Sequence, residues 1–167
     1  MMLVPAIMMK QEIEEAFNKL LYTDKLMWYD GCIDNFTHEV TTEEDKYAFA
    51  IVREDRYDSY ELIGYISFRI SWYISEAFNF GLIKFAEKDE QIMASALCEV
   101  VHMLKSFKVH RIDFRCVVDN PVFPKYCKLV SQFVGAYNIK KFTLKDCMRD
   151  RKGKYHDMAI FELIRYS

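Results

Sequence analysis

The segment Glu61–Tyr73 constrains the fold more than any other stretch of the chain. Its even positions from Leu62 to Trp72 carry Leu, Gly, Ile, Phe, Ile and Trp, whereas the odd positions from Tyr65 onward carry Tyr, Ser and Arg. A period of two residues is the signature of a β-strand with two different faces. This segment therefore predicts a long strand, and its neighbours decide what kind of sheet it joins.

The flanking segments predict an antiparallel arrangement. Tyr47–Arg53 and Phe78–Phe85 are predicted strands on either side of the long one. The charged turn Arg53–Glu61 and the short link Ser75–Ala77 connect the three strands, as expected for hairpins. Hairpin-connected strands run antiparallel.

The first 46 residues are less regular. Met1–Met9 is a predicted edge strand, because Pro5 is tolerated only at an edge or a bulge. Gln11–Tyr22 has apolar residues at helical spacing. Thr23–Lys46 is polar and irregular, and is predicted to be a loop with a short apolar patch.

The periodicity changes after the third hairpin strand. The apolar stripe from Ile92 to Phe107 predicts an amphipathic helix. The elements predicted after it are a strand, a helix and two further strands: Val109–Val118, Asn120–Val134, Tyr137–Cys147 and Met158–Ile164. Pro121 is expected in the first turn of the second helix and Gly135 just past its end.

This order predicts one α/β (α+β) domain over residues 1–167. Antiparallel hairpins followed by a strand–helix–strand crossover imply a mixed, mostly antiparallel central sheet with helices on both faces. The final strand is apolar on both faces apart from Glu162, which predicts a central position. A basic turn, Arg149–Lys154, precedes that strand.

Composition excludes several functional classes. The 167 residues include five Gly and three Pro, 51% are hydrophobic, and the net charge is only -2. These values exclude disordered and low-complexity chains, and they provide no basic field for nucleic acid. Neither GxxxxGK[ST] nor GxGxxG occurs, so P-loop and Rossmann nucleotide sites have no support.

The cysteines and the hydropathy of the chain indicate in which cellular compartment the protein is expected. The five cysteines form no CxxC pair, so neither a disulfide framework nor a metal site is expected. Reduced thiols favour a cytoplasmic protein. Met1–Met9 lacks a basic leader and a long apolar core, and no run reaches the roughly 18 apolar residues of a membrane span. We therefore expect no signal peptide and no membrane partner.

The order of elements, a 17-residue helix after the fourth strand and Asn120 at the exit of the fifth strand resemble the GCN5-related N-acetyltransferase (GNAT) superfamily from about residue 47 to the end. In that family a loop of pattern Q/R-x-x-G-x-G/A holds the pyrophosphate of CoA through backbone amides. Gln91–Ala96 occupies this position, with Gln91 and Ala96 matching and Ala94 standing where Gly is usual. Alanine donates the same N–H, but tolerates positive φ poorly.

A second match covers Asn120 to Lys128. The resemblance implies that Tyr126 protonates the leaving thiolate of CoA, that Asn120 bonds the pantetheine amides and that Lys128 neutralises phosphate. Tyr126 follows Asn120 by six residues where the family has seven. A half-buried structural tyrosine is the alternative interpretation. The residues expected to bind acetyl-CoA, the co-substrate, are Leu82, Ile83, Phe85, Gln91, Met93, Ala94, Ser95, Ala96, Asn120 and Lys128.

Other candidate groups have simpler interpretations. Glu76 and Glu87 are candidate general bases, although a surface position is the simpler interpretation of each. Cys127 is interpreted as a buried thiol, because direct transfer needs no covalent intermediate. The four histidines show no HxxxH spacing and are interpreted as structural. The stretch Gly153–Asp157 resembles the close of ribosomal-protein-type and related bacterial acetyltransferases.

The resemblance implies an acetyl-CoA-dependent N-acetyltransferase that acts on a primary amine of a small molecule or a peptide. The alternative is a non-catalytic acyl-CoA-binding or interaction module on the same fold, which Ala94 and the shifted Tyr126 motivate. The excess of aromatic residues, 16% of the chain, suggests a homodimer face or a pocket wall. In the fold of this family, the pantetheine arm enters between the strands 78–85 and 110–118.

Overall fold

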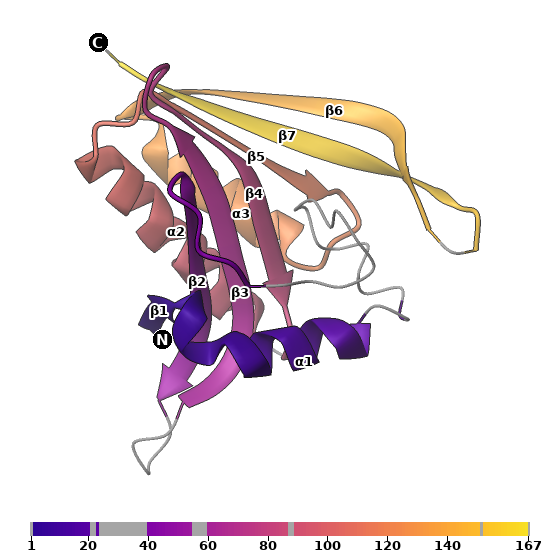
Figure 1. Cartoon of the computed structure of the whole chain (residues 1–167). Helices are drawn as coiled ribbons and strands as arrows, with labels where there is room; N and C mark the ends of the chain where they lie inside the picture. The colour runs from indigo at the N-terminus through magenta and orange to yellow at the C-terminus, as the bar shows by residue number, and fades with distance from the viewer. Residues whose placement is uncertain are drawn as a thin grey trace.

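The computed structural model of the chain describes residues 2–20, 23, 40–54, 60–86, 89–150 and 152–166. These residues form a seven-stranded sheet in the order β1-β2-β3-β4-β5-β7-β6 (Figure 1). The predicted loop before residue 40, the tip of the predicted turn at residues 55–59 and the candidate base Glu87 lie outside the described residues.

The first four strands form an antiparallel half-sheet, as the hairpin pattern predicts. They are β1 (Met2–Pro5), β2 (Lys46–Glu54), β3 (Tyr60–Ser71) and β4 (Glu76–Lys84). Pro5 lies in the edge strand β1, where the missing N–H costs no ladder bond. The predicted edge strand ends there, because Ala6–Met9 form a 3₁₀ helix.

The second half of the sheet is joined by a parallel pair. β5 (Arg111–Val117) pairs with β4 in parallel, and β7 (Tyr155–Arg165) lies between β5 and β6 (Tyr137–Arg149). The mixed, mostly antiparallel sheet and the central place of the last strand are thus confirmed. Within the described ranges, no helix combines the length and apolar content needed to cross a bilayer.

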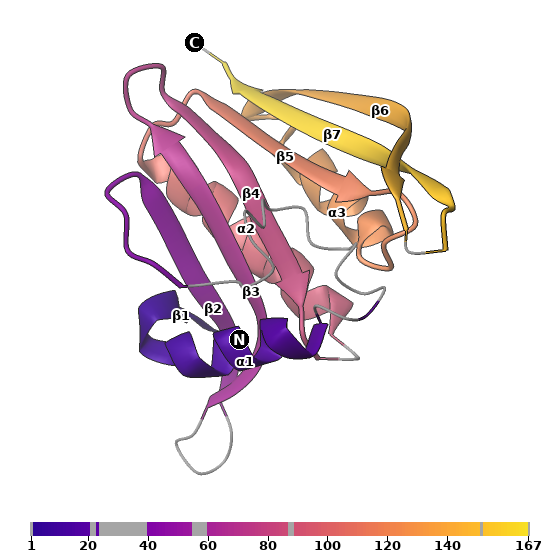
Figure 2. The ribbon, with the colours of Figure 1, turned by 45° about the vertical axis from the view of Figure 1, so that its right-hand side comes forward.

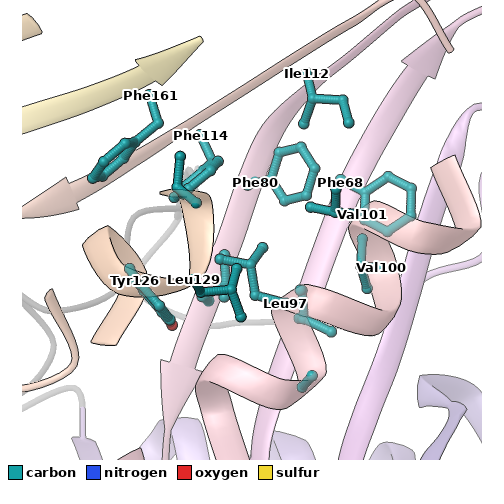
Figure 3. Close-up of a cluster of buried hydrophobic side chains, with 14 of the residues drawn as sticks. Phe68, Phe80, Leu97, Val100, Val101, Ile112, Phe114, Tyr126, Leu129 and Phe161 are labelled. Carbon is teal, nitrogen blue, oxygen red and sulfur yellow. The ribbon is translucent and has the colours of Figure 1, made fainter. Parts of the chain in front are cut away.

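Helices cover both faces of the sheet, as predicted. α1 (Lys10–Leu20) lies against one face, and α2 (Glu90–Ser106) and α3 (Phe123–Val130) lie against the other (Figure 2). Two buried clusters match these layers: one joins α1 to β1–β4, and the larger one joins α2 and α3 to the sheet. Figure 3 shows the larger cluster, in which aromatic rings of the sheet meet the apolar stripe of α2.

Both faces of β3 are covered: Tyr65, on the second face, is buried in the cluster that contains α1, and Ser67 on the same face is buried too. Three details of the sequence-based prediction were wrong. Trp72 lies in the turn after β3 and is 55% exposed. α3 begins at Phe123 instead of Asn120, so Pro124 rather than Pro121 occupies its first turn. Gly135 does not adopt the positive φ expected of a helix-terminating glycine.

Candidate functional site

The parallel strands β4 and β5 separate after a short contact. Their register contains only Glu76↔Arg111 and Ala77↔Ile112. A cavity of about 690 Å³ lies along this separation. Its walls come from the β3–β4 turn and five strands: Ser71, Ile74, Glu76, Phe78, Asn79, Phe80, Arg111, Asp113, Phe114, Arg115, Phe142, Ile160 and Glu162. The opening between the two strands, which the resemblance implies, is therefore present.

A β-bulge lies in β4 beside this cavity. Ser67 pairs with Gly81, but Arg69 pairs with Phe78, so β4 contains an extra residue at this point. Asn79 has φ 51°, a left-handed conformation that Asn tolerates better than most residues. A bulge takes backbone groups out of the ladder. Backbone N–H groups aimed into a cavity can stabilise an oxyanion.

Charged side chains gather in the wall of the cavity where β4 and β5 are still paired. Arg111 lies 2.8 Å from Glu162, 3.0 Å from Asp113 and 3.5 Å from Glu76. Burial raises the pKa of Glu76, and the attraction of Arg111, which opposes the rise, is offset in part by Asp113 and Glu162. A carboxyl with a raised pKa beside a cavity is suited to accept a proton. Glu76 is thus part of the cavity wall, not the plain surface acid that was the simpler interpretation.

A second cavity, of about 470 Å³, lies between α2 and α3. It brings together four of the residues predicted to bind CoA: Gln91, Ala94, Ser95 and Lys128. The sequence analysis missed the other residues of its lining: Cys98, Glu99, Lys125, Leu129 and Gln132. The signal for Lys125 was its spacing, because residues three apart on a helix share a face. Two lysines on one wall can neutralise phosphate groups.

The segment predicted as a phosphate loop is helical. Gln91–Ala96 lies within α2, which begins at Glu90, and Ala94 does not adopt the positive φ for which Gly would be needed. The first four N–H groups of a helix lack partners within it, and in α2 these belong to Asp89–Ile92. The Glu90 carboxylate accepts hydrogen bonds from the N–H groups of Glu90 and Asp89, which leaves those of Gln91 and Ile92. Met93 N–H already bonds Asp89 O at 3.1 Å. Glu90 lies in the first turn of α2, where an acid suits the helix dipole.

Two ion pairs surround this helix start. Asp89 is 2.5 Å from Arg53 of β2, and Glu90 is 2.5 Å from Lys84 of β4. The hydrogen bond from Lys84 lowers the pKa of Glu90. An anion at the free N–H groups of α2 would therefore meet two carboxylates and the two cations that pair with them.

The residues of the predicted catalytic motif occupy the start of α3. Tyr126 is only 2% exposed, and its ring meets the ring of Phe114 edge-on at 6.3 Å (Figure 3). Phe114 also lines the cavity between β4 and β5. Asn120 is 7% exposed, and its Oδ1 accepts a hydrogen bond from Val122 N–H at 3.0 Å. Asn120 thus shapes the turn that leads into α3.

The remaining predicted residues are parts of the core. Met93 and Ala96 are buried under α2, and Leu82 lies in the same cluster. Ile83 belongs to the cluster on the α1 face, and Phe85 packs against Phe17 of α1 at 5.3 Å. Contact of these five residues with a ligand would therefore involve mainly backbone atoms. In the part of the chain that the structure describes, no group of His, Cys, Asp or Glu is arranged to hold a metal ion.

Comparison with known proteins adds evidence on the fold. No protein-family model and no curated protein matches the sequence. A GNAT-family protein from Chromobacterium violaceum, classed as a probable acetyltransferase, matches over 97% of this chain and 85% of its own length, with a TM-score of 0.57 and 13% identity. The chain has the GNAT fold. A mutant of the spermidine N-acetyltransferase SpeG from Vibrio cholerae matches this GNAT fold over 73% of the chain and 67% of its own, with a TM-score of 0.52 and 18% identity.

Proposed function

We propose that this GNAT-fold chain is an acetyl-CoA-dependent N-acetyltransferase that transfers an acetyl group to a primary amine by direct attack. The observation that carries the proposal is the cavity between β4 and β5, which combines a backbone bulge with Glu76. An amine in this cavity would lose its proton to Glu76, and the bulge would stabilise the oxyanion.

The groove between α2 and α3 supports the co-substrate part of the proposal. Lys125 and Lys128 offer cations to the phosphates of CoA, and the start of α2 offers the N–H groups of Gln91 and Ile92, which have no acceptor within the helix. The pantetheine arm would then extend from this groove into the opening between β4 and β5. Tyr126 is the proposed acid that protonates the leaving thiolate.

The test combines calorimetry with a thiol-release assay over a panel of small amines, polyamines and peptides. We expect acetyl-CoA to bind and at least one amine to be acetylated. Tyr126→Phe keeps the ring that packs on Phe114, so it should lower kcat by about 10²-fold without loss of acetyl-CoA affinity. Unchanged turnover in this variant would exclude Tyr126 as the acid.

A non-catalytic acyl-CoA-binding module is the second candidate. The observations that favour it are the carboxylates Asp89 and Glu90 at the start of α2 and the burial of Tyr126. Binding of acetyl-CoA without turnover of any amine would support this candidate. Absence of acetyl-CoA binding would contradict both proposals.

A further inference from the structure

His156, near the start of β7, has a carboxylate on each ring nitrogen. Nδ1 lies 2.7 Å from Asp119 Oδ2, and Nε2 lies 3.2 Å from Asp150 Oδ2. The side chain is only 6% exposed. A carboxylate only accepts hydrogen bonds, and a neutral imidazole donates from one nitrogen alone. Both contacts are satisfied together only when both ring nitrogens carry a proton, so the geometry corresponds to an imidazolium.

The two carboxylates belong to different parts of the chain. Asp150 begins the turn between β6 and β7, and its Oδ1 accepts the N–H of Lys154 at 2.8 Å. Its backbone N–H bonds Lys154 O, and its carbonyl accepts the N–H of Gly153. These bonds hold Asp150 in place within the hairpin. Its carboxylate is therefore a fixed acceptor for the ring of His156.

Asp119 belongs to the turn between β5 and α3. It directly precedes Asn120, and its side chain is 53% exposed, with Lys154 Nζ at 3.8 Å as its other ionic contact. The same turn contains the bonds of Asn120 N–H to Val117 O and of Val122 N–H to Asn120 Oδ1. A change in the position of Asp119 therefore moves the backbone that orients Asn120.

We propose that His156 is a positioning residue that, as an imidazolium, holds the turn carrying Asn120 against the β6–β7 hairpin and releases this turn when it loses its proton. The proposal rests on the proposed function, because α3, which follows the turn, carries Tyr126 and one wall of the groove for acetyl-CoA. The affinity of the site for acetyl-CoA thereby depends on the protonation of His156.

The charges around the ring set the direction of this coupling. The hydrogen bonds to Asp119 and then Asp150 raise the pKa of His156 above 6.5, whereas burial and, to a smaller extent, the nearby cation Lys154 oppose the rise. A group whose pKa is raised by folding stabilises the fold fully below its unfolded pKa and loses this effect as pH rises through the folded value. The imidazolium therefore holds the turn at pH 6.5, and the turn loosens as the pH rises through the raised pKa of His156.

The first experiment uses the chain without ligand. ¹⁵N NMR of the histidine rings should show both nitrogens of His156 protonated below pH 6.5, with a titration midpoint above that value. Across that midpoint, the hydrogen-exchange protection factors of the Asn120 and Val122 amides should fall. Asp119→Asn should lower them at every pH, whereas His110→Gln, which alters an exposed histidine, should leave them unchanged. A titration midpoint of His156 at or below 6.5, or equal protection in Asp119→Asn, would overturn the proposal.

The second experiment measures acetyl-CoA affinity by calorimetry below and above the His156 midpoint. The unmodified chain should lose at least about fivefold in affinity, the lower end of ordinary coupling between sites. Asp119→Asn should bind acetyl-CoA weakly at both pH values. A change in affinity that both proteins share would come from titration of the phosphates of the ligand. An equal pH dependence in the two proteins would contradict the link to the site. If neither protein binds acetyl-CoA, the proposed function fails, and the NMR result still decides whether His156 holds the turn.

Discussion

Glu76 is the residue whose environment bears most on the proposed chemistry. Burial, Asp113 and Glu162 push its pKa above 4.5, while Arg111 pushes it down. Because the ionised form is the one that accepts a proton, activity should rise as pH increases through this raised pKa. The amine itself must also be neutral, which extends the rise toward alkaline pH.

We expect Glu76→Gln to lower kcat by about 10²-fold and to remove the acidic limb of the pH profile. Asp113→Asn is the matched control, because it removes another acid beside Arg111 but no proposed base. It should keep most of the rate and shift the acidic limb to lower pH. A Glu76→Gln enzyme that retains both rate and acidic limb would show that Glu76 is not the base.

Some site residues could be predicted from the sequence. Others could not, because their environments are formed by segments far apart in the chain. Gln91, Ser95 and Lys128 were predicted from the resemblance to the GNAT superfamily, and all three line the groove between α2 and α3. Glu76 and His156 could not be assigned, because their environments depend on distant residues. His156 meets Asp119 across 37 positions of the chain.

Packing between α2 and β3 depends on a glycine in the middle of the strand. A Cβ at Gly64 would lie 2.5 Å from the carbonyl oxygen of Ile83 and 2.7 Å from Sδ of Met93. Gly135, by contrast, has open space around the same position. The two glycines therefore form a matched pair for testing how closely the helix packs on the sheet.

Gly64→Ala should destabilise the chain by about 1–3 kcal/mol, because β4 and the buried Met93 must both move. Gly135→Ala should be neutral or stabilising by up to about 1 kcal/mol. Urea unfolding followed by circular dichroism measures both. Equal stability of the two variants would mean that α2 does not pack this closely on β3.

The types of the helices and strands could be predicted better than their bounds, bulges and buried faces. The alternation in β3 predicted a strand, but both of its faces are covered, so the apparent polar face includes the buried Tyr65. The bulge at Asn79 left no signal in the apolar pattern of β4. The start of α3 was predicted three residues early, because Pro121 and Pro124 both suit a first turn and only tertiary contacts choose between them.

At the scale of the whole molecule, paired carboxylates govern stability in acid. Arg69 lowers the pKa of Glu43, and Lys84 lowers that of Glu90. Carboxyls with lowered pKa values stabilise the fold above their unfolded pKa and lose this effect as pH falls through the folded value. Glu76, with a raised pKa, acts in the opposite direction.

We therefore expect the urea midpoint to fall as pH decreases from about 6 to about 3. Arg69→Gln removes the partner of Glu43 and Asp45, so its midpoint should be lower at pH 6 and should fall less on acidification. A midpoint that stays constant or rises in acid would contradict the assigned direction of these pKa values.

The arrangement of the sheet followed from the order of periodicities, because hairpins followed by a crossover leave few topologies. The homodimer expected from the aromatic excess stays a prediction. So does the acceptor, since cavity walls with charges of both signs suit several classes of amine.

The central claim is that acetyl-CoA occupies the groove between α2 and α3 and the opening between β4 and β5. Amide hydrogen exchange with and without acetyl-CoA tests it most directly. We expect added protection at residues 78–82 of β4 and at residues 89–92 at the start of α2, and none in α1. No added protection at any amide, or protection confined to α1, would contradict the claim.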